Sequence, residues 1–310
     1  MGSLILISPH GFCAGVERAV QMAEAMLRKF PKPVYCLKQI VHNRQIIEDL
    51  QSKGMVFVQE IREVPRGATV LFSAHGVPPA IREAARELGL KTVDATCPFV
   101  TKVHQEVKRF AAQGYSILLI GHHQHDEIIG VASEAPDHVT VIATREDARS
   151  VQVRDPGKVA VLTQTTLSMD EVAHVMEVLR ERFPHLKTPP ESDICYATKN
   201  RQQAIRMFAR QADAVIVLGA ENSSNSNRLV EVARAEGCSA YLASTLEKLD
   251  AIPLNNVNRL GITAGASTPE SFVRSAIAHL EKKGFSSFQE RTLIKEDIHF
   301  SIPRDLQDPV

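Results

Sequence analysis

Three of the five cysteines in this 310-residue chain stand in matching contexts. Cys13, Cys97 and Cys195 each come directly before a segment with the pattern of an amphipathic helix. The positive end of a helix dipole favours the thiolate form, which is the form that binds metals. Cys36 and Cys238 lie inside a strand-like run and at a helix end, where a free cysteine is usually a small buried apolar residue. The sequence therefore predicts that only the first three bind a metal.

Two kinds of metal centre suit three thiolates. One is a zinc ion held by three cysteines and a fourth ligand, and the other is a cubane iron–sulfur cluster with one iron left open. Structural zinc usually takes its ligands from one local knuckle, whereas these cysteines are 84 and 98 residues apart. The spacing and the soft ligands favour the cluster, whose open iron can bind a substrate oxygen as a Lewis acid.

Each cysteine is followed by two polar turns, and each turn comes directly after a predicted strand. Hydroxyl groups, amides and helix N-termini are the donors that bind phosphate, and histidine can add positive charge. The turns therefore predict an anion-binding shell. The first turns are His42-Asn43, His122–Glu127 and Asn222–Asn227, and the second turns are Ser73–Gly76, Thr163–Thr166 and Thr263–Ser267.

Particular side chains in these turns are candidates for binding and catalysis. A carboxyl group beside an anionic ligand has a raised pKa and can donate a proton, which makes Glu127 a candidate acid, although a solvated surface acid is the alternative. No site role is expected for His104, His138, His174, His185, His279 or His299. The candidate anion-binding residues are His42, His75, His125, Thr165, Thr166, Ser223, Ser224, Asn225 and Ser267.

Short apolar runs alternate with amphipathic helical stretches, which indicates an α/β fold with largely parallel sheets. Ligands of such sheets gather beyond the carboxyl ends of the strands. Three repeated α/β domains around a pseudo-threefold axis would bring the cysteines and turns to one central cavity. We expect a short strand at Asp297–Ile302 in the tail. The predicted ranges are 14–97 for the first domain, 98–195 for the second, 1–13 with 196–288 for the third, and 289–310 for a C-terminal tail.

Composition excludes several classes of protein. Lys plus Arg and Asp plus Glu both number 36, so the chain has no basic excess for binding nucleic acid. We find no apolar stretch long enough to span a membrane and no signal peptide, and the odd cysteine count suggests a reduced, cytoplasmic protein. The signatures Gly-x-x-x-x-Gly-Lys and Gly-x-Gly-x-x-Gly are absent from the sequence.

The ordered motifs resemble those of the 4-hydroxy-3-methylbut-2-enyl diphosphate reductases, the LytB/IspH family, over nearly the whole chain. The matching segments are Gly11–Val16, Val41–Asn43, Phe72–Gly76, Asp94–Pro98, Gln164–Ser168, Cys195–Thr198, Asn222–Arg228 and Thr263–Ser267. The resemblance implies a three-domain trefoil fold. It also implies the last step of the methylerythritol phosphate route, in which the allylic hydroxyl is removed to give isopentenyl and dimethylallyl diphosphate.

The resemblance further implies a cofactor, roles and partners. One [4Fe–4S] cluster per chain would be held by Cys13, Cys97 and Cys195, with one iron lacking a protein thiolate. Glu127 would be the proton donor, with Thr165 in the neighbouring polar network. A ferredoxin or flavodoxin would supply electrons to a monomer. The diphosphate would be held by His42, His75, His125, Ser223, Ser224, Asn225 and Ser267.

The sequence departs from the family pattern at one position, and two alternative functions stay open. Many family members have proline where this chain has Asp126, and a second carboxylate there is expected to shift the pKa of Glu127. The rivals are a non-catalytic cluster protein acting as a sensor and a zinc-dependent hydrolase of a phosphorylated metabolite. A sensor would need a partner-binding module, and we find no basic helix or added domain for one.

Overall fold

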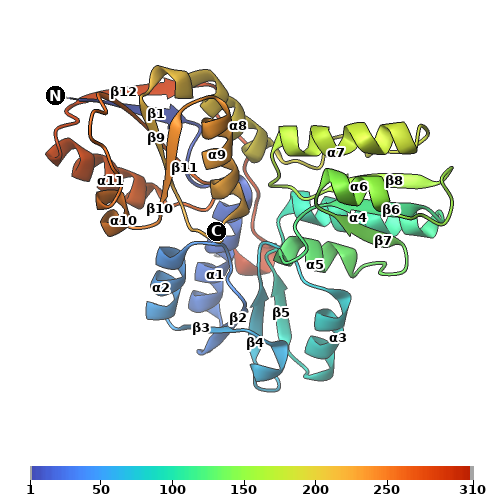
Figure 1. The fold of residues 1–310 in the computed structure, drawn as a ribbon. Coiled ribbons are helices and arrows are strands. Elements are labelled where there is room, and N and C mark those ends of the chain that lie inside the picture. The colour runs from blue at the N-terminus through green and yellow to red at the C-terminus, as the bar shows by residue number, and fades with distance from the viewer. Residues whose placement is uncertain (1, 308–310) are drawn as a thin grey trace. The chain divides into compact units, whose positions relative to one another are not determined.

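Every strand that the structure describes pairs in parallel with its neighbours, and the strands form three separate sheets. The structure is a computed structural model that describes residues 2–307. Parallel strands need long crossover connections, and helices supply most of them here (Figure 1). The predicted α/β fold with three repeated parallel units is confirmed.

The chain divides into two compact units. Unit 1 consists of Met1–Val16, His42–Ile46 and Tyr196–His299, and unit 2 consists of Glu17–Val41, Ile47–Cys195 and Phe300–Val310. Unit 1 holds one five-stranded sheet, and unit 2 holds a four-stranded and a three-stranded sheet. The domain boundaries expected from the sequence stay a prediction, and their outer ends, residue 1 and residues 308–310, lie outside the described residues.

Helices cover both faces of the sheet of unit 1 (Figure 1). Its strands, in spatial order, are β10 (Ser239–Ala243), β9 (Ala214–Leu218), β11 (Arg259–Ala264), β1 (Ser3–Ser8) and β12 (Ser287–Thr292). One face packs against α10 (Leu246–Asp250) and α11 (Glu270–Lys282), and the other against α8 (Tyr196–Phe208), η2 (Ala209–Gln211) and α9 (Ser224–Ala235). Because side chains alternate between two covered faces, all of β9 is buried.

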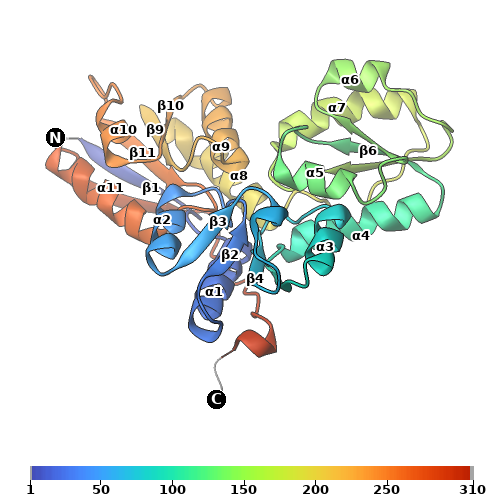
Figure 2. The ribbon, with the colours of Figure 1, turned by 90° about the horizontal axis from the view of Figure 1, so that it is seen from below.

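The three-stranded sheet of unit 2 is also sandwiched between helices (Figure 2). Its strands, in spatial order, are β7 (Val139–Ile142), β6 (Ser116–Ile120) and β8 (Val159–Thr163). One face packs against α6 (Arg145–Ser150) and α7 (Met169–Arg182), and the other against α4 (Pro98–Ala112) and α5 (Asp126–Ala132). Leu118 and Leu119 are both fully buried, on opposite faces.

The four-stranded sheet of unit 2 contains the first repeat. Its strands, in spatial order, are β3 (Met55–Val58), β2 (Val34–Leu37), β4 (Thr69–Phe72) and β5 (Lys91–Asp94). Helices α3 (Pro79–Glu87) and η1 (Ile61–Glu63) contribute Ala85 and Ile61 to its core. The remaining helices are α1 (Ala14–Lys29), α2 (Arg44–Ser52) and η3 (Arg304–Leu306); residues 14–16 and 44–46 belong to unit 1.

The prediction of a strand at Asp297–Ile302 in the tail is wrong. Residues 297–302 have no strand pairing, and the last strand is β12, which lies five residues earlier beside β1. Side chains hold this part of the chain instead: Glu296, directly before the segment, forms an ion pair with Arg201, and the Ser301 carbonyl within it accepts a hydrogen bond from Arg18. Every residue of β12 is exposed, and its sequence shows no alternation of apolar and polar residues. The sequence pattern therefore did not predict this strand.

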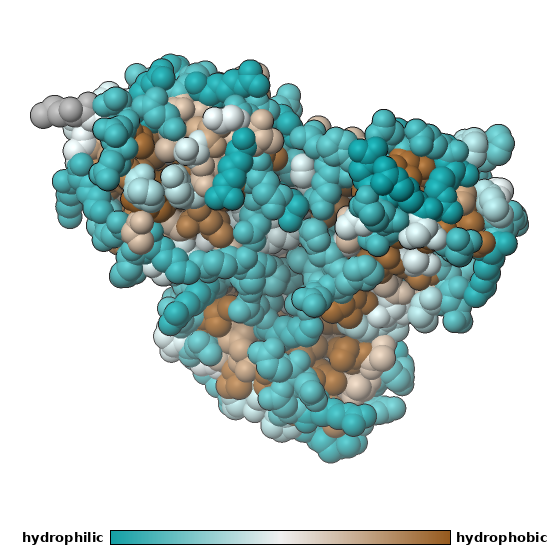
Figure 3. Space-filling view, in the orientation of Figure 1, coloured by the Kyte–Doolittle hydropathy of each residue, from teal (hydrophilic) through white to brown (hydrophobic). Residues whose placement is uncertain are grey.

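No helix among the described residues is long and apolar enough to cross a membrane. The visible surface in Figure 3 is mainly hydrophilic, with hydrophobic residues exposed in smaller areas. Large apolar side chains that stay exposed include Phe288 in β12 and Met207 in α8.

The two-faced burial of β6 leads to a stability prediction. Leu118→Ala and Leu119→Ala should each lower the free energy of unfolding by about 2–5 kcal/mol, because each leaves a cavity in a separate core layer. Phe288→Ala, on the exposed strand β12, should change it by less than about 0.5 kcal/mol. Urea unfolding followed by circular dichroism measures all three, and a small effect at either leucine would contradict the layer arrangement.

Candidate active site

The three sheets share one strand order that determines where polar turns fall. The first strand of each repeat lies between the second and the third: β2 between β3 and β4, β6 between β7 and β8, and β9 between β10 and β11. The chain therefore changes direction across the sheet between the first and third strands, which is where open α/β sheets bind ligands. The predicted polar turns are the ones that follow these two strands in each repeat.

The three helix-leading cysteines occupy equivalent positions in the repeats. The cysteines come directly before α1, α4 and α8, as predicted. Each backbone amide donates a hydrogen bond to the turn after a third strand: Cys13 to the Ala266 carbonyl at 3.1 Å, Cys97 to Ala74 at 3.0 Å, and Cys195 to Thr165 at 3.1 Å. One backbone bond thus ties each cysteine to a polar turn of another repeat, which for Cys97 and Cys195 is the turn that precedes the cysteine in the chain.

The exposure of the thiols separates the three helix-leading cysteines from the other two. Cys13, Cys97 and Cys195 are partly exposed, whereas Cys36 and Cys238 are buried. Burial raises the pKa of the Cys36 thiol far above its usual range and also raises that of Cys238, so both stay protonated. The three exposed thiols at helix N-termini fit the role of thiolate ligands for a soft metal centre, and the buried pair do not.

Glu127 is a buried carboxyl group held by one partner. Its side chain belongs to α5 and is 2% exposed, so it is not the solvated surface acid that the sequence left open. Oε1 accepts a hydrogen bond from the Thr165 amide at 2.7 Å, and Oε2 accepts one from the Thr165 hydroxyl at 2.9 Å. Since the Thr165 carbonyl also accepts from Cys195, this turn links the acid to a cysteine.

The environment of Glu127 makes it an acid that can carry a proton at neutral pH. Burial raises the pKa of Glu127 to about 7, while the two hydrogen bonds from Thr165 act to lower it. The charge of Asp193 acts in the raising direction. Asp193 is itself buried and its pKa is raised to about 6, chiefly by burial, against a hydrogen bond from the Thr163 amide.

Asp126 plays a different part from the one that the sequence suggested. The neighbouring carboxylate whose charge raises the pKa of Glu127 is Asp193, whereas Asp126 forms an ion pair with Lys38. Lys38 follows β2 with a φ of 57°, in the left-handed region that a lysine seldom adopts. The pair thus connects the turn after β2 to the first residue of α5.

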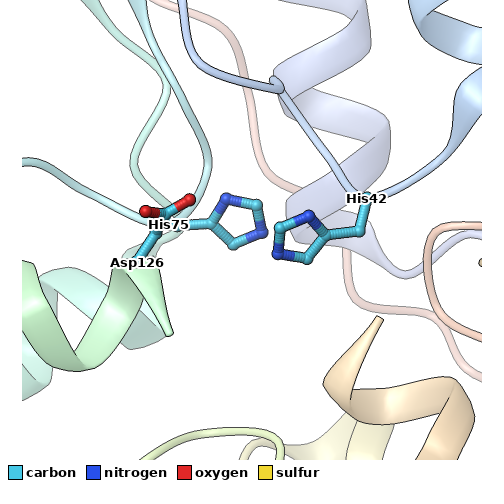
Figure 4. A group of neighbouring side chains, drawn as sticks. All are labelled: His42, His75 and Asp126. Atoms are coloured by element: carbon cyan, nitrogen blue, oxygen red, sulfur yellow. The ribbon is translucent and has the colours of Figure 1, made fainter. Parts of the chain in front are cut away.

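Two predicted histidines of unit 2 lie together near this helix. The rings of His75 and His125 meet edge to face, with centroids 5.7 Å apart. Nδ1 of His125 accepts a hydrogen bond from the Glu127 amide at 3.2 Å and so caps α5. His75 and Asp126 each offer a metal-binding atom within 4.8 Å of the other. Figure 4 labels these two residues of unit 2 and His42 of unit 1.

The other predicted donors lie in unit 1. The Ser267 hydroxyl donates to the His42 carbonyl at 3.0 Å. Nδ1 of the His42 ring lies 3.2 Å from the side-chain nitrogen Nδ2 of Asn222. Ser223 caps α9, whose first residue is the half-buried Ser224. The side-chain oxygen of the buried Asn225 accepts from the Ala266 amide at 2.9 Å. Unit 1 therefore brings His42, Ser267 and Asn225 onto adjoining turns.

Ser226 packs into two of these turns. A Cβ at Gly219 would lie 2.2 Å from its hydroxyl oxygen, and a Cβ at Gly265 would lie 2.1 Å from it. The hydroxyl donates to Ser223 Oγ at 3.1 Å. The turns after β9 and β11 therefore close around one buried serine.

Several residues that shape the site were missed from the sequence. The sequence could have indicated Asp193, because it stands two residues before the predicted metal ligand Cys195. No sequence pattern pointed to Arg201. It is fully buried and donates a hydrogen bond at 2.8 Å to the carbonyl of Gly11, which lies two residues before Cys13. No pattern pointed to Lys38 either, since its partner Asp126 is 88 residues away.

Comparison with known proteins identifies the family. A family model described as "LytB protein" matches residues 4–281. A 4-hydroxy-3-methylbut-2-enyl diphosphate reductase of Acidothermus cellulolyticus is 51% identical over 98% of this chain and 90% of its own. The same-named protein of Rhodococcus opacus is 51% identical over 98% of this chain and 91% of its own.

Solved structures agree with the sequence matches. The E-1-hydroxy-2-methyl-but-2-enyl-4-diphosphate reductase of Plasmodium falciparum matches with a TM-score of 0.95 and 37% identity, over 98% of this chain and 96% of that one. A second, (E)-4-hydroxy-3-methyl-but-2-enyl diphosphate reductase, the terminal enzyme of the non-mevalonate pathway, matches with a TM-score of 0.64 and 33% identity, over 91% and 100%. From its family match and these relatives, this chain belongs to the LytB protein family.

Proposed function

We propose that this chain reduces (E)-4-hydroxy-3-methylbut-2-enyl diphosphate, the last step of the methylerythritol phosphate route. Two electrons and two protons replace the allylic hydroxyl by hydrogen, so that water leaves and isopentenyl or dimethylallyl diphosphate forms. The names of the relatives support the substrate. The observation that carries the proposal is Glu127, a buried acid with a pKa raised to about 7 and fixed by Thr165.

Cys13, Cys97 and Cys195 would hold one [4Fe–4S] cluster per chain, which leaves one iron without a protein thiolate. The partly exposed thiols and their equivalent backbone bonds support this assignment. When bound, the cluster supplies electrons that no side chain can provide and a Lewis-acidic iron for the leaving oxygen. A ferredoxin or flavodoxin as electron donor, the monomeric state and the cytoplasmic location are parts of the same proposal.

Glu127 would donate the proton that leaves with the hydroxyl. At neutral pH a substantial share of this carboxyl group is protonated, because its pKa is about 7. Thr165 keeps both carboxyl oxygens in place through its amide and its hydroxyl. A positioned acid with a pKa near the working pH is the efficient choice for such a transfer.

The diphosphate would bind to the predicted donors, namely His42, His75, His125, Ser223, Ser224, Asn225 and Ser267. Support comes from the N-terminus of the twelve-residue helix α9, where Ser223 is the cap and Ser224 the first residue. Binding the distant diphosphate orients a small hydrocarbon at its reacting end.

The cofactor assignment predicts a selective loss of iron. Cys13→Ser, Cys97→Ser and Cys195→Ser should each greatly reduce iron and sulfide content, because a hydroxyl is a poor ligand for iron in a cluster. Cys36→Ser and Cys238→Ser are the matched controls and should retain both. Iron and sulfide analysis of anaerobically purified protein measures this, together with the brown absorption near 400 nm. A colourless protein containing zinc would favour the hydrolase, and full iron in Cys97→Ser would overturn the ligand set.

The acid assignment predicts a turnover defect without a binding defect. Glu127→Gln keeps the shape but removes the proton, so turnover with a strong artificial reductant should fall by about 10²–10⁴-fold. Substrate should still perturb the Mössbauer spectrum of the oxidised protein. Asp126→Asn is the control and should cost much less, since Asp126 is engaged with Lys38. A larger loss in Asp126→Asn than in Glu127→Gln would contradict the proton donor.

The pKa of Glu127 predicts a dependence on pH. Activity should fall as pH rises through about 7, because the ionised carboxylate cannot donate. Thr165→Val removes a hydrogen bond that lowers this pKa, so the midpoint should move to higher pH. Thr163→Val, at the buried end of β8, is the control: it keeps the backbone amide that donates to Asp193, so it should leave the midpoint in place. Initial rates across pH measure both, and a midpoint that moves down in Thr165→Val would refute the assignment.

A further inference from the structure

His104 occupies a buried place that the proposed chemistry does not use. It belongs to α4, and its side chain is 6% exposed. Nδ1 lies 2.7 Å from Oε1 of Glu134, whose other oxygen accepts from Lys108 at 2.9 Å. Nε2 has no hydrogen-bond partner among the described residues. One edge of the ring is thus anchored to the ion pair of Glu134 with Lys108, and the opposite edge holds the buried Nε2.

Two glycines leave the space that this ring fills. A Cβ at Gly76 would lie 2.8 Å from Nε2 of His104, and Gly76 has a φ of +82°. A Cβ at Gly130 would lie 3.4 Å from Cε1 of the same ring and 3.6 Å from the Val77 amide nitrogen. The ring therefore packs against the turn after β4 and against α5 at the same time.

Both of these contacts adjoin residues of the proposed reaction. Gly76 directly follows His75, and Gly130 stands three residues after Glu127, about one helical turn along α5. The Cβ position of Gly76 is also 3.4 Å from the methyl group of Thr96, which directly precedes Cys97. Three segments that carry proposed site residues therefore meet around His104 within unit 2.

The electrostatics of the pair favour a fixed ring. Burial lowers the pKa of His104, against the effect of the hydrogen bond that Nδ1 donates to Glu134, so the imidazole stays neutral with its proton on Nδ1. Burial acts to raise the pKa of Glu134, but hydrogen bonds from Lys108 and His104 outweigh it and keep the pKa low. A neutral donor and an ionised acceptor form a strong, directional bond.

We propose that His104 is a positioning residue, whose ring fixes helix α5 and the His75–Val77 turn so that Glu127 stands at the right place to donate its proton. The inference rests on the proposed function of Glu127. It assigns His104 no contact with substrate or cofactor.

The test replaces the ring while keeping its anchor. His104→Asn retains an amide donor for Glu134 but empties the space beside Gly76 and Gly130. We expect kcat to fall about 10–100-fold, since small displacements of reacting groups have effects of this size, while iron content stays unchanged. His138→Asn is the matched control: His138 bonds to the Tyr115 carbonyl at the amino ends of β6 and β7, and its loss should leave kcat within about twofold.

Refilling the space tests whether the contact itself matters. Gly130→Leu in the His104→Asn background extends a side chain from beside the ring into the space that the ring left, so it should recover part of the lost kcat. Gly130→Leu alone should lower kcat by a few-fold: a Cβ at this position already reaches contact distance, 3.4 Å from Cε1, so the longer side chain must displace the ring, while leucine supports the helix. This single variant keeps the test informative if His104→Asn does not fold.

A double-mutant cycle separates this inference from the function on which it rests. In a Glu127→Gln background, His104→Asn should cost little more, because the positioned proton is already gone. Additive losses, or an unchanged kcat in both His104→Asn and Gly130→Leu, would overturn the positioning role. Full activity of Glu127→Gln itself would instead overturn the proposed acid.

Discussion

The hydrogen bond between each helix-leading cysteine and the turn of a neighbouring strand is the constraint around which each repeat is built. The same bond occurs at Cys13, Cys97 and Cys195, each to the carbonyl in the turn after a third strand. It requires a strand order in which the third strand lies next to the segment that leads into the cysteine. That order is met by β11 beside β1, by β4 beside β5, and by a single parallel bridge between β8 and Lys187.

The acid site illustrates how burial and hydrogen bonding oppose one another. If Glu127 were equally buried without Thr165, its pKa would be higher still, and if it were exposed, the same bonds would hold it ionised. A pKa of about 7 is the balance between these two effects. Since Thr165 also receives the bond from Cys195, the residue that tunes the acid is fixed by the cysteine segment.

The features that were predictable from the sequence are those encoded within short stretches of it. The cysteine contexts, the polar turns and the buried strand β9 each depend on about ten adjacent residues. The exposed edge strands β5 and β12 carry no apolar alternation and could not be found in that way. Contacts such as Thr165 to Glu127 and His104 to Glu134 join residues 38 and 30 positions apart, and no local pattern encodes them.

The packing of Ser226 between Gly219 and Gly265 determines which substitutions this chain can accommodate there. Either glycine could acquire a side chain only after the serine had become smaller, because its hydroxyl oxygen already fills both Cβ positions. A smaller residue at 226 would in turn open a void beneath two turns at once. The three positions are therefore bound to a fixed order of substitution, in which a change at the serine must precede a change at either glycine.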